Sequence, residues 1–207
     1  MSACECHNDA EELSQQRGLL LTLLGLNFTM FLFESGSGWW VDSAGLLADG
    51  LDMLADAAVY ALALYAVGRG ARSKAGAALA SGFAQLCLAL LLIWHIYQRW
   101  RYGTEPLGEW MIAIAALALA VNLVCLWLLR RHRRGEVHMR ASWLFSANDV
   151  LVNLGVMVAG GMVSWSASPW PDLLIGSVIV LLVMRTGARI VVDAQRELRG
   201  ETKRGLA

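Results

Sequence analysis

The sequence is poor in charge. Only 16% of its 207 residues are Asp, Glu, Lys or Arg, whereas 57% are hydrophobic. A soluble domain of this length carries about 25% charged residues. The shortfall, together with a mean hydropathy of +0.50, indicates a membrane protein. The formal net charge is zero, which excludes a bulk attraction to nucleic acid.

Cysteine is scarce as well. Of the four cysteines, Cys87 and Cys125 lie in apolar runs and are interpreted as small core residues. Cys4 and Cys6 are too close in sequence for a normal disulfide, so no secreted disulfide framework is expected. The polar start of the chain also lacks the basic segment and cleavage site of a signal peptide, and we expect the first apolar run to be a permanent span.

The apolar residues are gathered in six long runs. A membrane-spanning helix needs roughly 20 mainly apolar residues, and six segments meet this requirement. We therefore expect an all-α integral membrane protein in which residues 18–195 form a six-helix transmembrane domain. The polar tails, residues 1–17 and 196–207, are too short to build a core of their own. The six predicted spans are residues 18–38, 44–67, 75–98, 108–129, 139–163 and 172–194.

Positive charge is almost missing from one set of loops. Of the 17 Lys and Arg, Arg99 and Arg101 alone fall on one side, and the others lie in the tails, near 69–74 and 130–140, or toward the end of the last span. Lys and Arg accumulate on the cytoplasmic side of a membrane, so both termini are predicted to be cytoplasmic. The opposite ends of the spans carry tryptophans typical of an interfacial aromatic belt: Trp39, Trp40, Trp110, Trp165 and Trp170.

Acidic residues are rare within the spans, yet the segment LLADGLDMLADAAVY contains Asp49, Asp52 and Asp56. A charge at the centre of a bilayer is expensive. At a rise of about 1.5 Å per residue, Asp52 and Asp56 lie about 12 and 18 Å from the outer face, and Asp149 lies about 15 Å from the inner face. In a hydrocarbon core about 30 Å thick, these carboxylates meet near the midplane.

No Lys or Arg falls in the middle of a predicted span, so protons or a bound cation remain to neutralise the carboxylates. Oxygen ligands suit a hard or borderline dication, whose affinity falls as the carboxylates become protonated. We predict a midplane site for a divalent cation that competes with protons. The alternative is a structural hydrogen-bonded cluster between helices. Asp49 fits either role equally, whereas Asn27 and Asn153 are more typical of helix–helix contacts.

Two segments identify a family. SAGLLADGLDMLADAAVYALALYAVG resembles the second span of the cation diffusion facilitators, the efflux family for zinc and related metals, and RASWLFSANDVLVNLGVMVAG resembles the fifth span. The resemblance covers about residues 15–195. It implies the six-span fold, the metal ligands Asp52, Asp56 and Asp149, and a divalent cation as substrate rather than cofactor.

The sequence departs from this family in two ways. Phe145 stands where the fifth span usually has a histidine, and an amide oxygen of Asn148 or Asn153 can complete the ligand set instead. Such an all-oxygen site is harder, and it suits manganese, magnesium or calcium better than a site with imidazole does. The family also usually carries a cytoplasmic ferredoxin-like domain after the sixth span. The sequence ends at Ala207, so we expect that domain to be absent.

These observations favour a secondary transporter that exports a divalent cation of the Zn, Cd, Co or Mn class in exchange for protons, across a bacterial inner membrane. The alternative is a non-transporting metal-binding accessory or sensor protein with the same fold. An enzyme is not expected, because no nucleophile, His–Glu pair or cofactor motif accompanies the carboxylates.

Two further features bear on metal capture and assembly. Cys4, Cys6 and His7 can collect soft metal ions at the cytoplasmic mouth. Gly155, Ala159 and Gly160 of the fifth span permit close helix packing, either within the chain or in a homodimer through the membrane helices.

Overall fold

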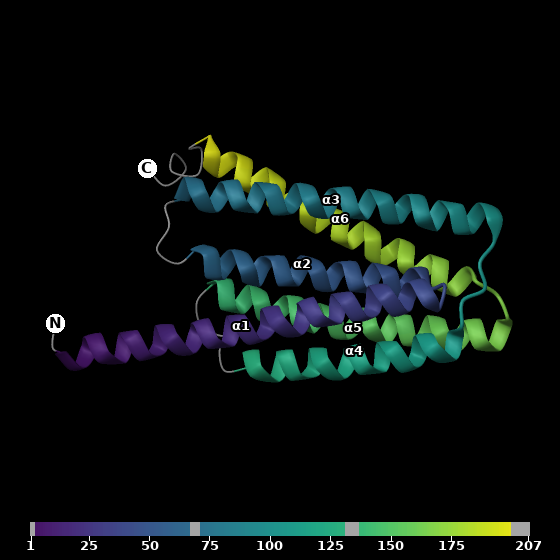
Figure 1. The fold of residues 1–207 in the computed structure, drawn as a ribbon, viewed down its shortest axis with the longest axis horizontal. Coiled ribbons are helices and arrows are strands. Elements are labelled where there is room, and N and C mark those ends of the chain that lie inside the picture. The colour runs from purple at the N-terminus through teal and green to yellow at the C-terminus, as the bar shows by residue number, and fades with distance from the viewer. Residues whose placement is uncertain (1–2, 67–70, 131–136, 200–207) are drawn as a thin grey trace.

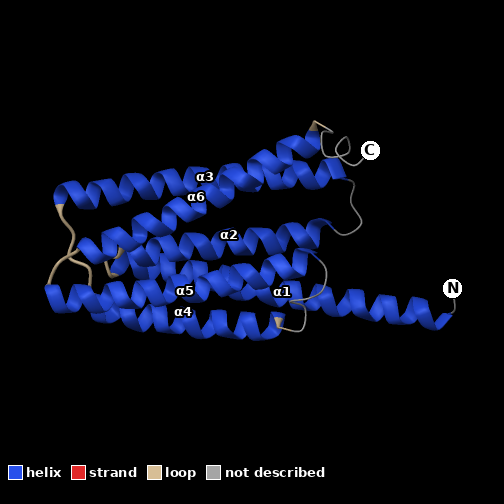
Figure 2. Ribbon diagram, turned by 180° about the vertical axis from the view of Figure 1, so that it is seen from behind, coloured by secondary structure: helices blue, strands red, loops and turns tan. Residues whose placement is uncertain are grey.

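The computed structural model describes residues 3–66, 71–130 and 137–199, and it contains helices and no strand within these ranges (Figure 2). The side chains of residues 3–16, 66, 71, 73, 74 and 137–146 lie outside this description. The all-α prediction is confirmed. The helices are α1 (Ala3–Trp40), α2 (Ala44–Ala66), α3 (Ala71–Tyr102), α4 (Gly108–Leu129), α5 (Val137–Ser166) and α6 (Trp170–Leu198).

Five of these helices contain a segment long and apolar enough to cross a membrane. The exception is α2, whose 23 residues make a helix about 34 Å long. Its length is sufficient for a span, but its three aspartates make it too charged to qualify by composition. Six spans therefore stay a prediction. The structure also begins α1 at Ala3 rather than near residue 18, so part of the expected N-terminal tail is helical.

The helices form a group of four with a pair beside it. In Figure 1, α1, α2, α4 and α5 lie together, while α3 and α6 run side by side along one flank of this group. The start of α1 and the end of α6 lie at the same end of the molecule. This agrees with termini on one side of the membrane, and their cytoplasmic placement stays a prediction.

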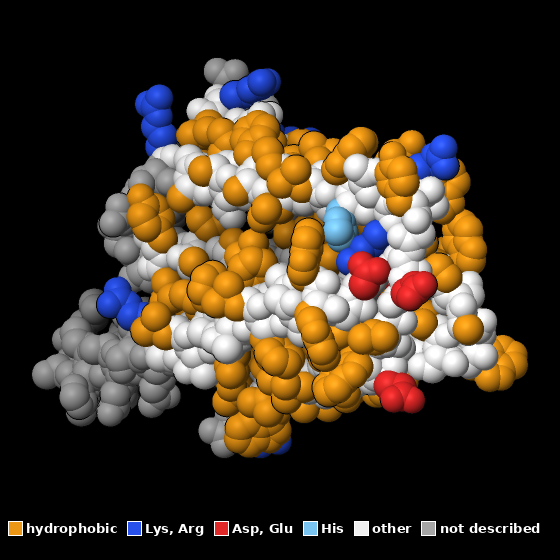
Figure 3. All heavy atoms as spheres, turned by 45° about the vertical axis from the view of Figure 1, so that its right-hand side comes forward, with side chains coloured by type: hydrophobic (Ala, Val, Ile, Leu, Met, Phe, Trp, Pro, Cys, Tyr) orange, Lys and Arg blue, Asp and Glu red, His pale blue; other side chains and the backbone are white. Residues whose placement is uncertain are grey.

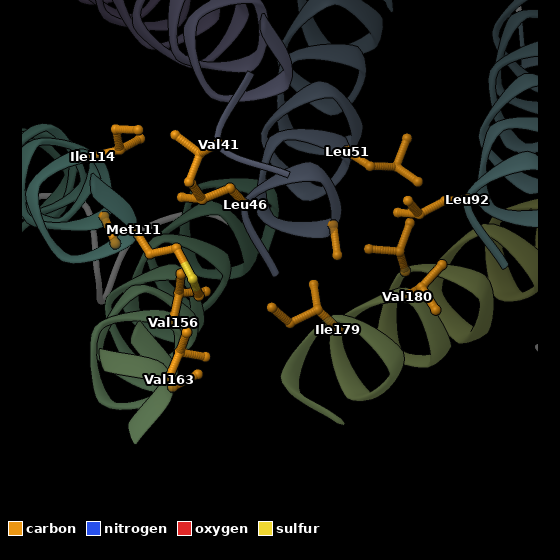
Figure 4. Close-up of a cluster of buried hydrophobic side chains, with 14 of the residues drawn as sticks. Val41, Leu46, Leu51, Leu92, Met111, Ile114, Val156, Val163, Ile179 and Val180 are labelled. Atoms are coloured by element: carbon orange, nitrogen blue, oxygen red, sulfur yellow. The ribbon is translucent and has the colours of Figure 1, made fainter. Parts of the chain in front are cut away.

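The main hydrophobic core joins the turn after α1 to the five helices that follow. Branched and unbranched aliphatic side chains from α2, α3, α4, α5 and α6 meet there, as Figure 4 shows for part of the cluster. Most of these residues lie toward the end at which α2 and α6 begin. The core therefore fixes that end of the bundle. Its best buried members are Val41, Leu46, Ala48, Ala89, Met111, Ala115, Val156, Ile179 and Val183.

Small residues bring α5 close to its neighbours in the same chain. A Cβ added at Gly160 would lie 2.8 Å from the backbone oxygen of Gly108 in α4, and one at Gly155 would lie 2.9 Å from Cδ1 of Ile175 in α6. Both distances are shorter than a carbon atom tolerates. The small residues predicted to allow close packing thus serve contacts within the chain.

Asp172 joins the first turns of α6 and α2. It is fully buried, and its carboxylate accepts hydrogen bonds from Oγ of Ser43 at 2.6 Å, from the amide of Ala44 at 2.7 Å and from the amide of Gly45 at 2.9 Å. The amides at a helix N-terminus have no partner within their own helix. Asp172 therefore caps α2 from another helix and sets α2 and α6 in register.

An ion pair ties α3 to the same end of the molecule. Arg99 Nη2 lies 2.6 Å from Oδ1 of Asp42, in the turn between α1 and α2. Asp42 has a left-handed backbone (φ 59°) and also accepts hydrogen bonds from Thr104 and from the amide of Glu105. Figure 3 shows charged side chains and a histidine gathered near one end of a largely apolar face. The contacts at Asp42 and Asp172 hold four segments together at this end.

The first prediction concerns this cap. Asp172→Ala leaves three donors buried without an acceptor and should lower the free energy of unfolding by roughly 3 kcal/mol. The measurement is thermal unfolding of the purified protein in detergent. Asp193→Ala is the control, because Asp193 lies on the same helix with its side chain 74% exposed. Equal melting temperatures for the two variants would contradict the role assigned to Asp172.

Candidate metal-ion site

Helical spacing places two carboxylates of α2 on the side that faces α5. Asp52 and Asp56 are one turn apart; Asp52 is partly exposed, and Asp56 is buried. Asp149 of α5 is also buried, and its carboxyl group interacts directly with that of Asp56. Oδ2 of each of these two residues has no hydrogen-bond partner. The predicted ligands from two helices are thus brought together, and both carry free oxygen lone pairs.

A cavity of about 440 Å³ adjoins these carboxylates. Since a water molecule occupies about 30 Å³ in the liquid, this volume has room for a dication and several waters. Residues of α2, α5 and α6 form its wall. The polar and charged residues of the lining are Asp52, Asp56, Asn148, Asp149, Arg185, Thr186 and Arg189.

The cavity contains two basic residues that the sequence analysis placed elsewhere. Arg185 and Arg189 of α6 were assigned to the cytoplasmic end, and the expectation that no basic residue lies beside the carboxylates is wrong. The cap that Asp172 forms on α2 explains why the two arginines lie at the cavity. Asp172 fixes the start of α6 beside Ala44, and α2 and α6 then run in the same direction. Asp56 and Arg185 therefore lie about 18 and 20 Å further along their helices, at nearly one level.

Asp49 lies apart from this cavity. It is fully buried against α1, where its carboxyl group interacts with that of Glu34, which is also fully buried. None of their four oxygens has a hydrogen-bond donor among the described residues. Sequence analysis did not single out Glu34, although it lies within the predicted span 18–38. The signal that could have identified Glu34 is an acidic residue directly after an apolar run, at a level close to that of Asp49 on the next helix.

The two asparagines proposed to complete the ligand set differ in position. Asn148 is exposed and lines the cavity. Asn153 is fully buried, and its Nδ2 donates to the backbone oxygen of Asp149 at 2.9 Å, one turn earlier on α5. Its Oδ1 is left without a partner. Asn153 therefore offers a free oxygen inside the bundle, whereas Asn148 offers one at the cavity wall.

No three His, Cys, Asp or Glu side chains of the described residues are close enough together to hold a metal ion in this conformation. The arrangement is a contacting pair, Asp56 and Asp149, with Asp52 on the same cavity wall. The side chains of Cys4, Cys6, His7 and Phe145 lie outside the described residues.

Comparison with known proteins supports the family resemblance. Residues 20–199 match the model of the cation efflux transmembrane domain. The chain is 28% identical over 192 residues to the zinc transporter ZitB of Escherichia coli, an alignment that covers 86% of this chain and 61% of ZitB. It is 25% identical over 203 residues to a cadmium, cobalt and zinc/H(+)-K(+) antiporter of Bacillus velezensis, with 91% of this chain and 64% of the antiporter covered.

The chain therefore spans less than two thirds of the length of these relatives. The family model nevertheless matches most of it, including α2 and the described part of α5 with their carboxylates. Together with the apolar helices, this identifies a multi-pass protein of the bacterial inner membrane. The chain belongs to the cation efflux family, also called the cation diffusion facilitators.

Proposed function

We propose that this protein exports a divalent metal cation from the cytoplasm in exchange for protons. The observation that carries the proposal is the contact between Asp56 and Asp149 beside a cavity that also contains Asp52. Carboxylates in the interior of a membrane protein mark ion and proton pathways. The names of the relatives, which transport zinc, cadmium and cobalt, agree with a dication as the substrate. Transport rather than catalysis is the expected activity.

In this mechanism the carboxylates hold either the cation or protons. Asp52, Asp56 and Asp149 bind the dication, and the ion displaces protons from them because a ligand oxygen must be deprotonated to coordinate it well. The core and the two contacts at Asp42 and Asp172 keep one end of the bundle together. The cavity then gives access from the other end, and movement of helices around the site exposes the ion to the opposite side.

Arg185 and Arg189 also line this cavity, from the facing helix α6. Three carboxylates on one cavity would attract any cation and hold it strongly. Two guanidinium groups on the facing helix weaken this field, and a transport site must release its ion as well as bind it.

The second candidate is a metal-binding accessory or sensor protein with the same fold. The finding that favours it is the absence of three gathered ligands among the described side chains. The two functions differ in one measurement. Proteoliposomes that contain a metal-sensitive dye report metal movement for a transporter and none for a binder.

The second prediction tests the site. Asp56→Ala and Asp149→Ala should each weaken metal binding by more than roughly 100-fold, since even the loss of a second-shell partner of a metal ligand costs 10–100-fold. Calorimetry with Zn²⁺ and Mn²⁺ on the purified protein measures the affinity, and the liposome assay measures transport. Asp193→Ala serves as control, because its side chain is exposed. Parent-like affinity in either site variant removes that residue from the mechanism.

The third prediction concerns protons. Metal binding should release protons, and the affinity should rise with pH, because protons and the dication compete for the same carboxylates. Calorimetry in two buffers of different ionisation enthalpy counts the released protons. When a pH gradient is imposed on the liposomes, protons should flow down the gradient and metal should move across the membrane in the opposite direction. Proton release without gradient-driven movement would support the accessory protein, and no release at all would contradict the site.

The fourth prediction concerns selectivity. Phe145→His should add a nitrogen ligand and shift the affinity ratio toward Zn²⁺ over Mn²⁺, since imidazole suits zinc and oxygen ligands suit manganese. The measurement is the ratio of the two affinities in the parent and the variant. Phe145→Leu is the matched control without a nitrogen. An unchanged ratio would show that position 145 does not face the ion.

A further inference from the structure

A polar layer crosses three helices between two apolar clusters. The layer consists of Asn27 in α1, Asp56 in α2 and Asn122 in α4, and each member is at most 6% exposed. One cluster contains Leu23, Tyr60 and Cys125, and the other contains Met30, Met53 and Ala118. On every one of the three helices, the polar residue lies three or four positions from a member of each cluster. The three polar side chains therefore share one level of the bundle.

The amide of Asn27 is oriented by its own helix. Its Nδ2 donates a hydrogen bond to the backbone oxygen of Leu23 at 2.9 Å and a second, weak one to Sγ of Cys125 in α4 at 4.0 Å. Its Oδ1 is buried and has no partner. Asn153 on α5 shows the same arrangement, with the amide nitrogen bound one turn back and the oxygen free. Asp56 adds an unpartnered Oδ2 to the same layer.

This pattern does not suit a purely structural asparagine. An amide that joins two helices places both its donor and its acceptor in hydrogen bonds, and a buried acceptor without a partner costs about 1–3 kcal/mol. Here the amide nitrogen of Asn27 has both hydrogen bonds, one within α1 and one to Cys125 of α4, whereas its buried oxygen has none. Free carboxylate and amide oxygens are the ligands that a hard dication takes.

We propose that Asn27 is a further ligand of the transported dication, binding it through Oδ1 together with Asp56. The inference rests on the proposed function and adds α1 to a site built so far from α2, α5 and α6. Asn27 then supplies an oxygen ligand to the metal site, whose fifth span has Phe145 in place of a histidine. The added amide oxygen biases the site toward hard ions such as Mn²⁺ relative to softer Zn²⁺ or Cd²⁺.

Asn122 provides the matched control. It has the same side chain as Asn27, lies in the same layer and is equally buried at 1% exposed. Its unpartnered atom, however, is Nδ2. An amide nitrogen donates hydrogen bonds and cannot coordinate a cation. Loss of packing in the layer affects both residues, whereas loss of an oxygen ligand affects Asn27 alone.

The experiment compares Asn27→Ala, Asn27→Asp and Asn122→Ala with the parent chain in detergent. Calorimetric titration with Mn²⁺ and with Zn²⁺ gives the affinities, and thermal unfolding without metal gives the stability. Asn27→Ala should weaken Mn²⁺ binding by about tenfold, which corresponds to about 1.4 kcal/mol, and should weaken Zn²⁺ binding less. Asn27→Asp keeps the shape, adds a charge and should strengthen binding of both ions. Asn122→Ala should leave both affinities within about twofold, a shift of roughly 0.4 kcal/mol.

Several outcomes would overturn the assignment of Asn27. These are unchanged Mn²⁺ affinity in Asn27→Ala, equal losses in Asn27→Ala and Asn122→Ala, or no gain in Asn27→Asp. If Asn27→Ala does not fold, Asn27→Asp decides the question alone. Failure of the proposed function gives a different result, in which the parent chain binds no dication or Asp56→Ala binds it as well as the parent does.

Discussion

The dominant constraint on this protein is the need to neutralise carboxylates inside a membrane. Asp49, Asp56, Asp149 and Glu34 are buried among apolar helices, and ionised carboxylates in such surroundings require a partner charge. The ion pair at the end of the bundle occupies Arg99 with Asp42, so that arginine is not available to them. Among the described residues, Arg185 and Arg189 are the only basic residues that line the cavity. The remaining negative charge requires protons or a cation, and the proposed exchange of metal for protons rests on this requirement.

The packing divides the molecule into a fixed end and an end that admits a cavity. Asp172 caps α2, Arg99 holds the turn after α1, and the main core joins five helices near these contacts. Toward the other end, α2 and α5 border α6 across the cavity rather than through a continuous apolar contact. A bundle held at one end can change the separation of its helices at the other without loss of its core. This is the property that alternating access needs.

The sequence predicted the helices and the three carboxylates of the site because both depend on local patterns. Apolar runs of sufficient length identify spans, and Asp52 and Asp56 share a face through the geometry of one helix. Contacts between helices were harder to predict from the sequence. The level of Arg185 depends on the hydrogen bonds of Asp172 to α2, and nothing in the sequence of α6 reveals them. Glu34 was missed for a similar reason, because its burial beside Asp49 depends on the packing of α1 against α2.

The proposed ligand set also accounts for Phe145 in place of the histidine usual in the fifth span of the family. Imidazole supplies one neutral ligand, and the buried amides of Asn27 and Asn153 each have a neutral oxygen without a hydrogen-bond partner. Replacing nitrogen by oxygen leaves the charge of the ligand set unchanged and alters only its hardness. Divalent cations share the same charge but differ in their preference for soft ligands. Such a replacement therefore keeps a divalent substrate and changes which divalent ion is preferred. Selectivity in this fold can therefore be set by neutral residues around an unchanged set of carboxylates.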